Sequence, residues 1–406
     1  MLRPGFSRLF CRQQNELISQ KLICLHRFVR SHIQHACCKP SWTPSASVIV
    51  TLKDSLVNQL QALLPICVHS PKKFPHDYHL LLLKRPQSSL SFGGKMVFPG
   101  GTVCRTDFEC DLWTESVPLD AKFEARSRPP IYTEVMRQFR LTDTSALRLH
   151  PSVILRLCAL RELFEETGLL LVENDSVPQP SANAFILCGE ELRYWQDQLS
   201  HNSSSFPALY KHLLQRPPLN ALSEWSNWLT PKEFVRRFDT IFYHVHLERI
   251  LSRAGSIDSH VKWQSPEVDS MYVGKPAAFL HGSTDFLVPP QIYELGRLCQ
   301  FVQSDQLTRF AQQRAILGCR RWCPIPIHVA IAGQRCTIYL VPGDERYEQV
   351  MRSEHTKLTA VDLVSDCHRN RLVISSGASQ LWWDSSVYEL GHVTPVTCAE
   401  YRIFYG

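Results

Sequence analysis

The sequence predicts an α/β fold, because two kinds of segment follow one another along the chain. Short apolar runs at 47–52 and 78–84 are rich in β-branched or leucine residues and are typical of buried strands. Segments with helical spacing of apolar residues lie at 55–64 and 290–303. Strands interspersed with helices in this way favour a layered α/β domain over an all-helical or all-strand one.

Length and composition indicate a folded protein with room for one large domain and an extension. Of the 406 residues, 44% are hydrophobic and 20% are charged, a balance typical of globular proteins. No apolar run approaches the roughly 20 residues of a membrane span. The net charge of +6 is spread over the whole chain, so we expect no nucleic-acid partner. The fifteen cysteines are scattered and odd in number, which favours free thiols in a reduced compartment.

The basic N-terminal segment, residues 1–44, has the composition of a mitochondrial presequence. Its first 40 residues contain one acidic residue, Glu16, and seven basic ones with apolar residues between them: Arg3, Arg8, Arg12, Lys21, Arg27, Arg30 and Lys39. We therefore expect mitochondrial delivery. A basic tail without a targeting role is the alternative.

Three carboxylates are concentrated within one helical turn. Glu162, Glu165 and Glu166 stand at i, i+3 and i+4, so they share one face of a helix. Gly168 follows where a helix commonly ends in a left-handed residue, and at that end the helix dipole does not stabilise anions. Hard oxygen ligands of this kind suit Mg²⁺ or Mn²⁺. The stretch predicts a divalent-metal site, and a solvated acidic helix end is the alternative.

A glycine pair precedes this helix by a long way. Phe98-Pro99-Gly100-Gly101 follows a predicted strand and a polar loop, and paired glycines let the backbone approach a ligand closely. Farther along, His244 and His246 share one face of a predicted strand at 238–247. We interpret these two histidines as core residues and not as metal ligands.

The two stretches together resemble the Nudix box, G-x5-E-x7-R-E-U-x-E-E-x-G-U. Arg161 to Gly168 is similar to its second half, and Gly101 to its first residue. Arg161 lies 60 residues after Gly101 (161 − 101), so an insertion, about residues 108–150, splits the motif. Asp107 stands where the motif has its first Glu. A split box of this kind is a feature of one branch of the family, the mammalian-type peroxisomal coenzyme A diphosphatases.

The resemblance implies a fold and a domain division. We expect a Nudix fold, an α/β/α sandwich with a mixed sheet, over residues 45–303, and a C-terminal extension over residues 304–406. The insertion is expected to be a surface excursion with short helices.

The resemblance also implies an activity, the Mg²⁺- or Mn²⁺-dependent hydrolysis of coenzyme A and acyl-CoA to 3′,5′-ADP and (acyl-)4′-phosphopantetheine. The implied metal ligands and catalytic residues are Glu162, Glu165 and Glu166, with Arg161 holding the carboxylates in register. Gly100 and Gly101 would form the floor beneath the phosphates. Arg85 and Lys84 are our candidates for binding the 3′-phosphate, and two residues that only cap the edge of a strand are the alternative. Glu267 and Asp269 are candidates for the general base by position alone.

Two departures from the family pattern keep alternatives open. The coenzyme A signature is matched by Leu82, Leu83, Arg85, Gly94 and Phe98, but its second Arg is absent. Another nucleoside diphosphate derivative, such as a dinucleotide or a nucleotide sugar, is therefore an alternative substrate, and a non-catalytic nucleotide-binding module is a further alternative. The chain ends in residues 404–406, Phe-Tyr-Gly, and not in a peroxisomal tripeptide, so peroxisomal location rests on the resemblance alone. The sequence does not define an oligomeric state.

Overall fold

The structure, a computed structural model, describes residues 42–395 except for the following gaps: 70–73, 119, 124, 140–148, 175, 177–179, 253–262, 282–285, 332, 353–368, 376–377 and 384–391. The predicted presequence therefore lies almost entirely outside the described residues. No helix within the described ranges is long and apolar enough to cross a membrane.

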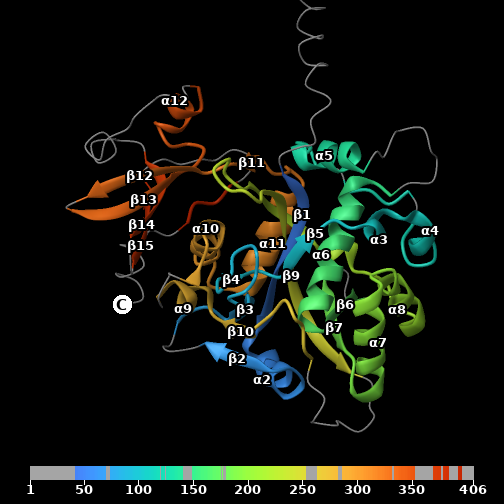
Figure 1. The fold of residues 1–406 in the computed structure, drawn as a ribbon. Coiled ribbons are helices and arrows are strands. Elements are labelled where there is room, and N and C mark those ends of the chain that lie inside the picture. The colour runs from blue at the N-terminus through green and yellow to red at the C-terminus, as the bar shows by residue number, and fades with distance from the viewer. Residues whose placement is uncertain are drawn as a thin grey trace, which may run out of the picture. The chain divides into compact units, whose positions relative to one another are not determined.

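A mixed sheet forms the centre of the fold, with the strand order β11-β8-β9-β1-β3-β10-β2 (Figure 1). The central strand β1 (Thr43–Lys53) runs parallel to β9 (Phe238–Ser252) and antiparallel to β3 (Tyr78–Lys84). The outer strands are β8 (Ser223–Leu229), β11 (Arg321–Trp322), β10 (Ser270–Gly274) and β2 (Ile66–His69). Four short strands pair beside this path: β4 (Met96–Val97) with β3, β5 (Gly100–Thr102) with β1, β7 (Ala182–Ile186) with β9, and β6 (Leu169–Glu173) with β7.

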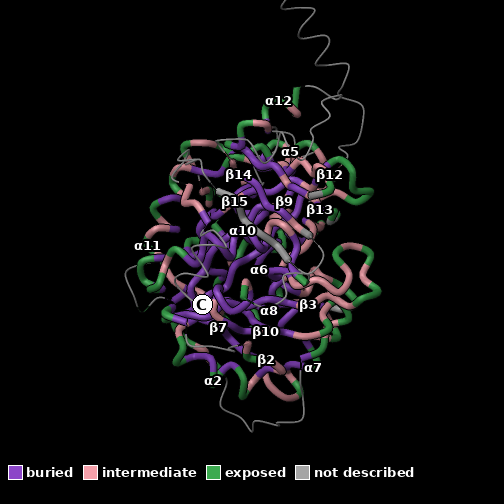
Figure 2. The backbone as a smooth tube through the Cα atoms, turned by 90° about the vertical axis from the view of Figure 1, so that its left-hand side faces the viewer, coloured by how far each residue is buried: buried purple, intermediate pink, exposed green. Residues whose placement is uncertain are grey.

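Helices cover both faces of this sheet. Along β1, Val48 and Val50 enter one hydrophobic core, whereas Ile49 enters a second core, as the two-residue period of a strand requires. The first core contains α2 (Asp54–Leu63) and α6 (Pro151–Thr167), and the second contains α10 (Pro289–Leu298) and α11 (Ser304–Ala315). Figure 2 shows buried residues concentrated in the middle of the molecule, including β9 and α6. The predicted α/β/α sandwich is confirmed.

Helix α6 is buried on nearly all sides, between β1, β5 and β6. It begins with Pro151 at its first turn, where a missing N–H costs nothing. It ends at Gly168, which has φ 76°, so the predicted left-handed helix end is confirmed. The end of the helix that carries the three glutamates therefore lies beside β5, which contains Gly100 and Gly101.

The insertion forms short helices, as predicted, and a few buried side chains attach it to the domain. Its helices are α4 (Cys110–Trp113) and α5 (Pro130–Gln138), preceded by α3 (Arg105–Phe108). Trp113 is fully buried, and its ring lies 5.9 Å from that of Phe206 in α8 (Ser205–Leu213). Ile131 and Val135 of α5 are equally buried in the first core. These apolar side chains hold the insertion against the domain.

The C-terminal part adds a second, antiparallel sheet. Its order is β12 (Ile325–Ile331), β13 (Gln334–Leu340), β14 (Asn370–Ser375) and β15 (Ala378–Trp383), with α12 (Tyr347–Arg352) between β13 and β14. Val341 and Leu372 belong to the second core of the main sheet. Both α11 and β11 also pack against or pair with β8. The division of the chain at residues 303 and 304 stays a prediction. The helices α7 (Gly189–His201) and α9 (Pro276–His281) complete the described elements used below.

Candidate active site

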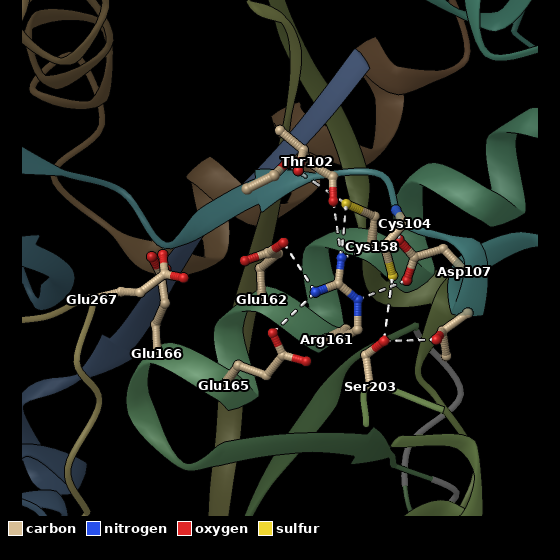
Figure 3. A network of polar contacts seen from close by, with 12 residues as sticks. Thr102, Cys104, Asp107, Cys158, Arg161, Glu162, Glu165, Glu166, Ser203 and Glu267 are labelled. Atoms are coloured by element: carbon tan, nitrogen blue, oxygen red, sulfur yellow. Dashed lines mark hydrogen bonds and ion pairs between the residues drawn. The ribbon is translucent and has the colours of Figure 1, made fainter. Parts of the chain in front are cut away.

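Arg161 joins the two halves of the split motif (Figure 3). Its Nε and Nη2 donate to the two carboxylate oxygens of Asp107 over 2.9 and 3.1 Å, and Nη2 also donates to the Thr102 carbonyl oxygen over 3.0 Å. Arg161 and Asp107 are both buried, and a two-pronged pairing of this kind fixes orientation as well as charge. Asp107 also accepts from the Cys104 N–H over 2.8 Å. The insertion thus leaves the motif intact in space.

Two of the three predicted carboxylates face the same guanidinium. Glu162 Oε1 and Glu165 Oε2 each lie 3.0 Å from Arg161 Nη1. Their side chains are 13% and 28% exposed, so both have a route to a ligand. Arg161 Nη1 therefore pairs with both of these carboxylates.

The third carboxylate, Glu166, faces the glycine pair. Its Oε2 accepts from the Gly100 N–H over 2.9 Å, and its Oε1 lies 3.7 Å from Arg85 Nη1. Arg85 Nη2 in turn lies 3.6 Å from Glu267 Oε2. Arg85 Nε is buried and has no hydrogen-bond partner in the described part of the chain. A buried donor without a hydrogen bond costs free energy, so Arg85 is suited to donate to an oxygen of a ligand.

Neighbouring atoms lie so close to Gly100 and Gly101 that neither position has room for a side chain. A Cβ at Gly101 would lie 2.4 Å from the carboxyl carbon of Glu162, and one at Gly100 would lie 2.4 Å from the Ala46 carbonyl oxygen. Gly100 also has φ 153°. A side chain at either position would displace the backbone of β1 or the Glu162 carboxylate.

The site carries more negative than positive charge. Five carboxylates surround two guanidinium groups: Asp107, Glu162, Glu165, Glu166 and Glu267 against Arg85 and Arg161. Burial, followed by the Glu165 and Asp107 charges, raises the pKa of Glu162 to about 7 against the opposing effect of Arg161. Burial also raises the pKa of Glu165, and burial together with the Glu162 charge raises the pKa of Glu166. A divalent cation would remove this surplus.

The donor set fits a hard divalent ion in its chemistry. In the present side-chain arrangement the described residues include no group of three His, Cys, Asp or Glu side chains placed to hold a metal. Glu162 and Glu165 turn to Arg161, and Glu166 turns to Gly100 and Arg85.

A pocket of about 620 Å³ opens beside the carboxylates, within the usual range of roughly 300–1,000 Å³ for small-molecule sites. Glu162, Arg85, Gly100, Gly101 and Glu267 line one end. The remaining wall comes from the loops around 88–92, 228–238 and 288–291, and from Pro324 and Tyr339 of the C-terminal part.

Not every predicted residue reaches the pocket. Lys84 pairs with Asp269 over 3.5 Å, and neither residue lines the cavity. Sequence reasoning did not identify the wall formed by the 228–238 loop, Phe92 and Tyr339. Phe92 and Phe234, which are aromatic residues in loops and are exposed, could have indicated part of this wall.

Comparison with known proteins defines the class. The family model of the NUDT19 Nudix domain matches residues 42–298, and the chain therefore belongs to the Nudix hydrolases. It is a hydrolase that acts on diphosphate bonds and takes a small-molecule substrate. Within that class it belongs to the NUDT19 family.

Several relatives share most of their length with this chain. The acyl-coenzyme A diphosphatase NUDT19 of Gallus gallus is 34% identical over 68% of this chain and 74% of its own. The human protein of the same name is 31% identical over 66% and 72%, respectively. The crystal structure of a Nudix hydrolase from Alicyclobacillus acidocaldarius is similar with a TM-score of 0.41 and 17% identity, over 66% of this chain and 96% of that one.

Proposed function

We propose that this chain hydrolyses the diphosphate bond of coenzyme A and its acyl esters, releasing 3′,5′-ADP and (acyl-)4′-phosphopantetheine. Its chicken and human relatives are named acyl-coenzyme A diphosphatases. The observation that carries the proposal is the pocket, which places Glu162, the Gly100–Gly101 backbone and Arg85 at one end of a cavity large enough for an extended ligand.

The charge of the site calls for a divalent cation, which we propose to be Mg²⁺ or Mn²⁺. A diphosphate is anionic, and the surplus of carboxylates around Arg85 and Arg161 would repel it. When bound, the cation would neutralise phosphate oxygens and lower the pKa of a water molecule. Glu162, Glu165 and Glu166 are the residues proposed to hold it.

The chain's other residues orient the substrate and the carboxylates. Arg161, fixed by Asp107, holds Glu162 and Glu165 in register. Gly100 holds Glu166 through its N–H, and the absence of side chains at 100 and 101 leaves room for phosphates. Arg85, whose Nε has no partner within the described residues, is placed to donate to a diphosphate oxygen.

Glu267 is the better candidate of the two for the general base. It lines the pocket and is 61% exposed, so its carboxylate can approach a water molecule. Asp269 pairs with Lys84 and lies outside the pocket lining.

Replacing the box carboxylates tests the proposal. Glu165→Gln and Glu166→Gln keep the size of each side chain and, at 166, the acceptor for the Gly100 N–H, but remove the charge. We expect each variant to fold normally and to lose turnover of coenzyme A by orders of magnitude, because a ligand of the cation is lost. The exposed Glu190 at the start of α7 gives a control, Glu190→Gln. Near-normal turnover in either site variant would refute the assignment.

For location, we propose delivery to mitochondria by residues 1–44, with peroxisomal location as the alternative implied by the resemblance. A reporter fused to residues 1–45 should accumulate in mitochondria. A diffuse cytosolic signal would refute this proposal.

A further inference from the structure

The loop between β8 and β9 carries two consecutive arginines in different surroundings. Arg237 Nε donates to the Thr230 carbonyl oxygen over 3.0 Å, and its guanidinium lies 5.2 Å from the centre of the Trp42 ring. Arg236 is exposed, lines the pocket, and makes no hydrogen bond or ion pair with any described residue. Arg237 thus anchors the loop, whereas Arg236 lines the cavity.

The loop has a fixed base. Thr230 N donates to the Phe238 carbonyl oxygen over 2.9 Å, and Phe238 N donates to Thr230 Oγ1 over 3.0 Å. These bonds close the loop at the point where it meets the sheet. Arg236 therefore stands next to two residues, Arg237 and Phe238, that are tied to Thr230.

Aromatic side chains line the pocket together with Arg236. Phe92, Phe234 and Phe238 all contribute to the wall, and the Phe92 and Phe238 ring centres are 6.5 Å apart. Phe92 and Phe234 are 38% and 43% exposed. Exposed rings beside a free guanidinium suit a ligand with a planar base and a phosphate, because bases stack on aromatic rings and guanidinium binds phosphate through two parallel bonds.

Two cations among the described residues line the pocket, and the substrate has two phosphate positions. Arg85 lies beside Glu166 and Glu267 at the carboxylate end, where the diphosphate must be cleaved. Lys84 is engaged by Asp269 and does not reach the cavity. Arg236 is left for a phosphate elsewhere on the ligand.

We propose that Arg236 binds the 3′-phosphate on the nucleoside half of the substrate, with the adenine ring against the Phe92 and Phe234 side of the pocket. The inference rests on the proposed function and names the specificity residue of the same site. It replaces the expectation that Arg85 and Lys84 share this role.

The test compares coenzyme A with dephospho-coenzyme A, which lacks only the 3′-phosphate. In the full-length protein assayed with Mg²⁺, Arg236→Gln should lower the ratio of kcat/KM for coenzyme A to kcat/KM for dephospho-coenzyme A by about 10- to 100-fold, the range for a lost hydrogen bond to a charged group. Arg236→Lys keeps the charge without the fork and should lie between the two. Lys232→Gln removes a charge from the same loop, outside the pocket lining, and should leave the ratio at its wild-type value.

A binding measurement gives a readout that does not depend on turnover. Titration calorimetry should show that the wild type binds 3′,5′-ADP more tightly than 5′-AMP and that Arg236→Gln removes most of this difference. If Arg236→Gln changes neither the kinetic ratio nor the binding difference, the inference is overturned while the proposed function stands. If the wild type cleaves neither form of coenzyme A, the proposed function itself fails.

Discussion

At the scale of single residues, the site depends on a missing side chain as much as on the charged ones. The Glu162 carboxylate lies against Gly101, in the space that a Cβ would fill. Because Glu162 ends a flexible side chain, it can move to accommodate an added methyl group, but only by leaving its place beside Arg161 Nη1. We therefore expect a substitution at Gly101 to affect activity more than stability.

The first prediction concerns Gly101→Ala. Displacing a reacting or ligating group by about 1 Å can cost on the order of 100-fold in rate, whereas overpacking costs roughly 1–3 kcal/mol. We expect kcat to fall about 100-fold with a modest loss in the free energy of unfolding. Steady-state kinetics and urea denaturation of the same preparation measure both. A folded variant with wild-type kcat would show that the Glu162 position is not critical.

Local residue patterns predicted the carboxylates and the glycine pair because their geometry depends on neighbours within one turn or one strand. Spacing identified Glu162, Glu165, Glu166 and the left-handed Gly168. It did not predict the partnership of Arg85 with Glu267 or the free Arg236, since those depend on loops that meet only in the folded chain.

At the scale of elements, β9 carries two buried histidines that are held by one hydroxyl group. Thr51 Oγ1 of β1 lies 3.0 Å from His244 Nε2 and 3.0 Å from His246 Nδ1. Burial, and for His244 the neighbouring His246, lowers the pKa of His244 to about 3 and that of His246 to about 4. Their interpretation as core residues agrees with this burial.

The second prediction is a pH dependence of stability. Because the pKa of His244 is lowered in the folded state, the unfolded state takes up the proton first, so stability is full above pH 6.5 and is lost as pH falls toward 3. Between about pH 7.5 and about pH 5 the loss from this group is about 2 kcal/mol. His244→Gln lacks this group, so its unfolding free energy should fall by that much less over the same range. Urea denaturation at the two pH values measures the difference, and parallel losses in both proteins would contradict the account.

The limits of sequence reasoning at this scale follow from burial. Helix α6 is enclosed on nearly all sides, so its first turns show no apolar stripe, and the sequence located only its carboxylate end. The insertion is held to the domain by buried side chains, among them Trp113, Ile131 and Val135. Its many prolines and arginines gave no indication of this burial in the sequence.

At the scale of the whole molecule, the C-terminal sheet contributes to the pocket. Tyr339 of β13 and Pro324 line the cavity, although the family model ends at residue 298. The second core, which includes Val341, Leu372 and Trp322, holds this part against the main sheet. No local pattern in the sequence connects Tyr339 with Arg85 or Glu162, because only the tertiary fold brings them to one cavity.

The third prediction is that Tyr339→Ala raises KM for coenzyme A several-fold while leaving kcat near its wild-type value, since the residue lines the pocket and is not one of the proposed metal ligands. Thr337→Ala, two residues earlier on the same strand and outside the pocket lining, is the matched control. Equal kinetics for Tyr339→Ala and Thr337→Ala would show that the C-terminal sheet does not contact the substrate.

The central claim is that the assembled split box cleaves the diphosphate of coenzyme A, and product analysis tests it most directly. The purified chain is incubated with Mg²⁺ and coenzyme A, acyl-CoA, a nicotinamide dinucleotide or a nucleoside diphosphate sugar, and the products are separated by chromatography. We expect 3′,5′-ADP and 4′-phosphopantetheine (or its acyl ester) in equal amounts, formed faster than products from the other substrates and absent with Glu166→Gln. Faster cleavage of a dinucleotide or nucleotide sugar, or binding without turnover of any substrate, would contradict it.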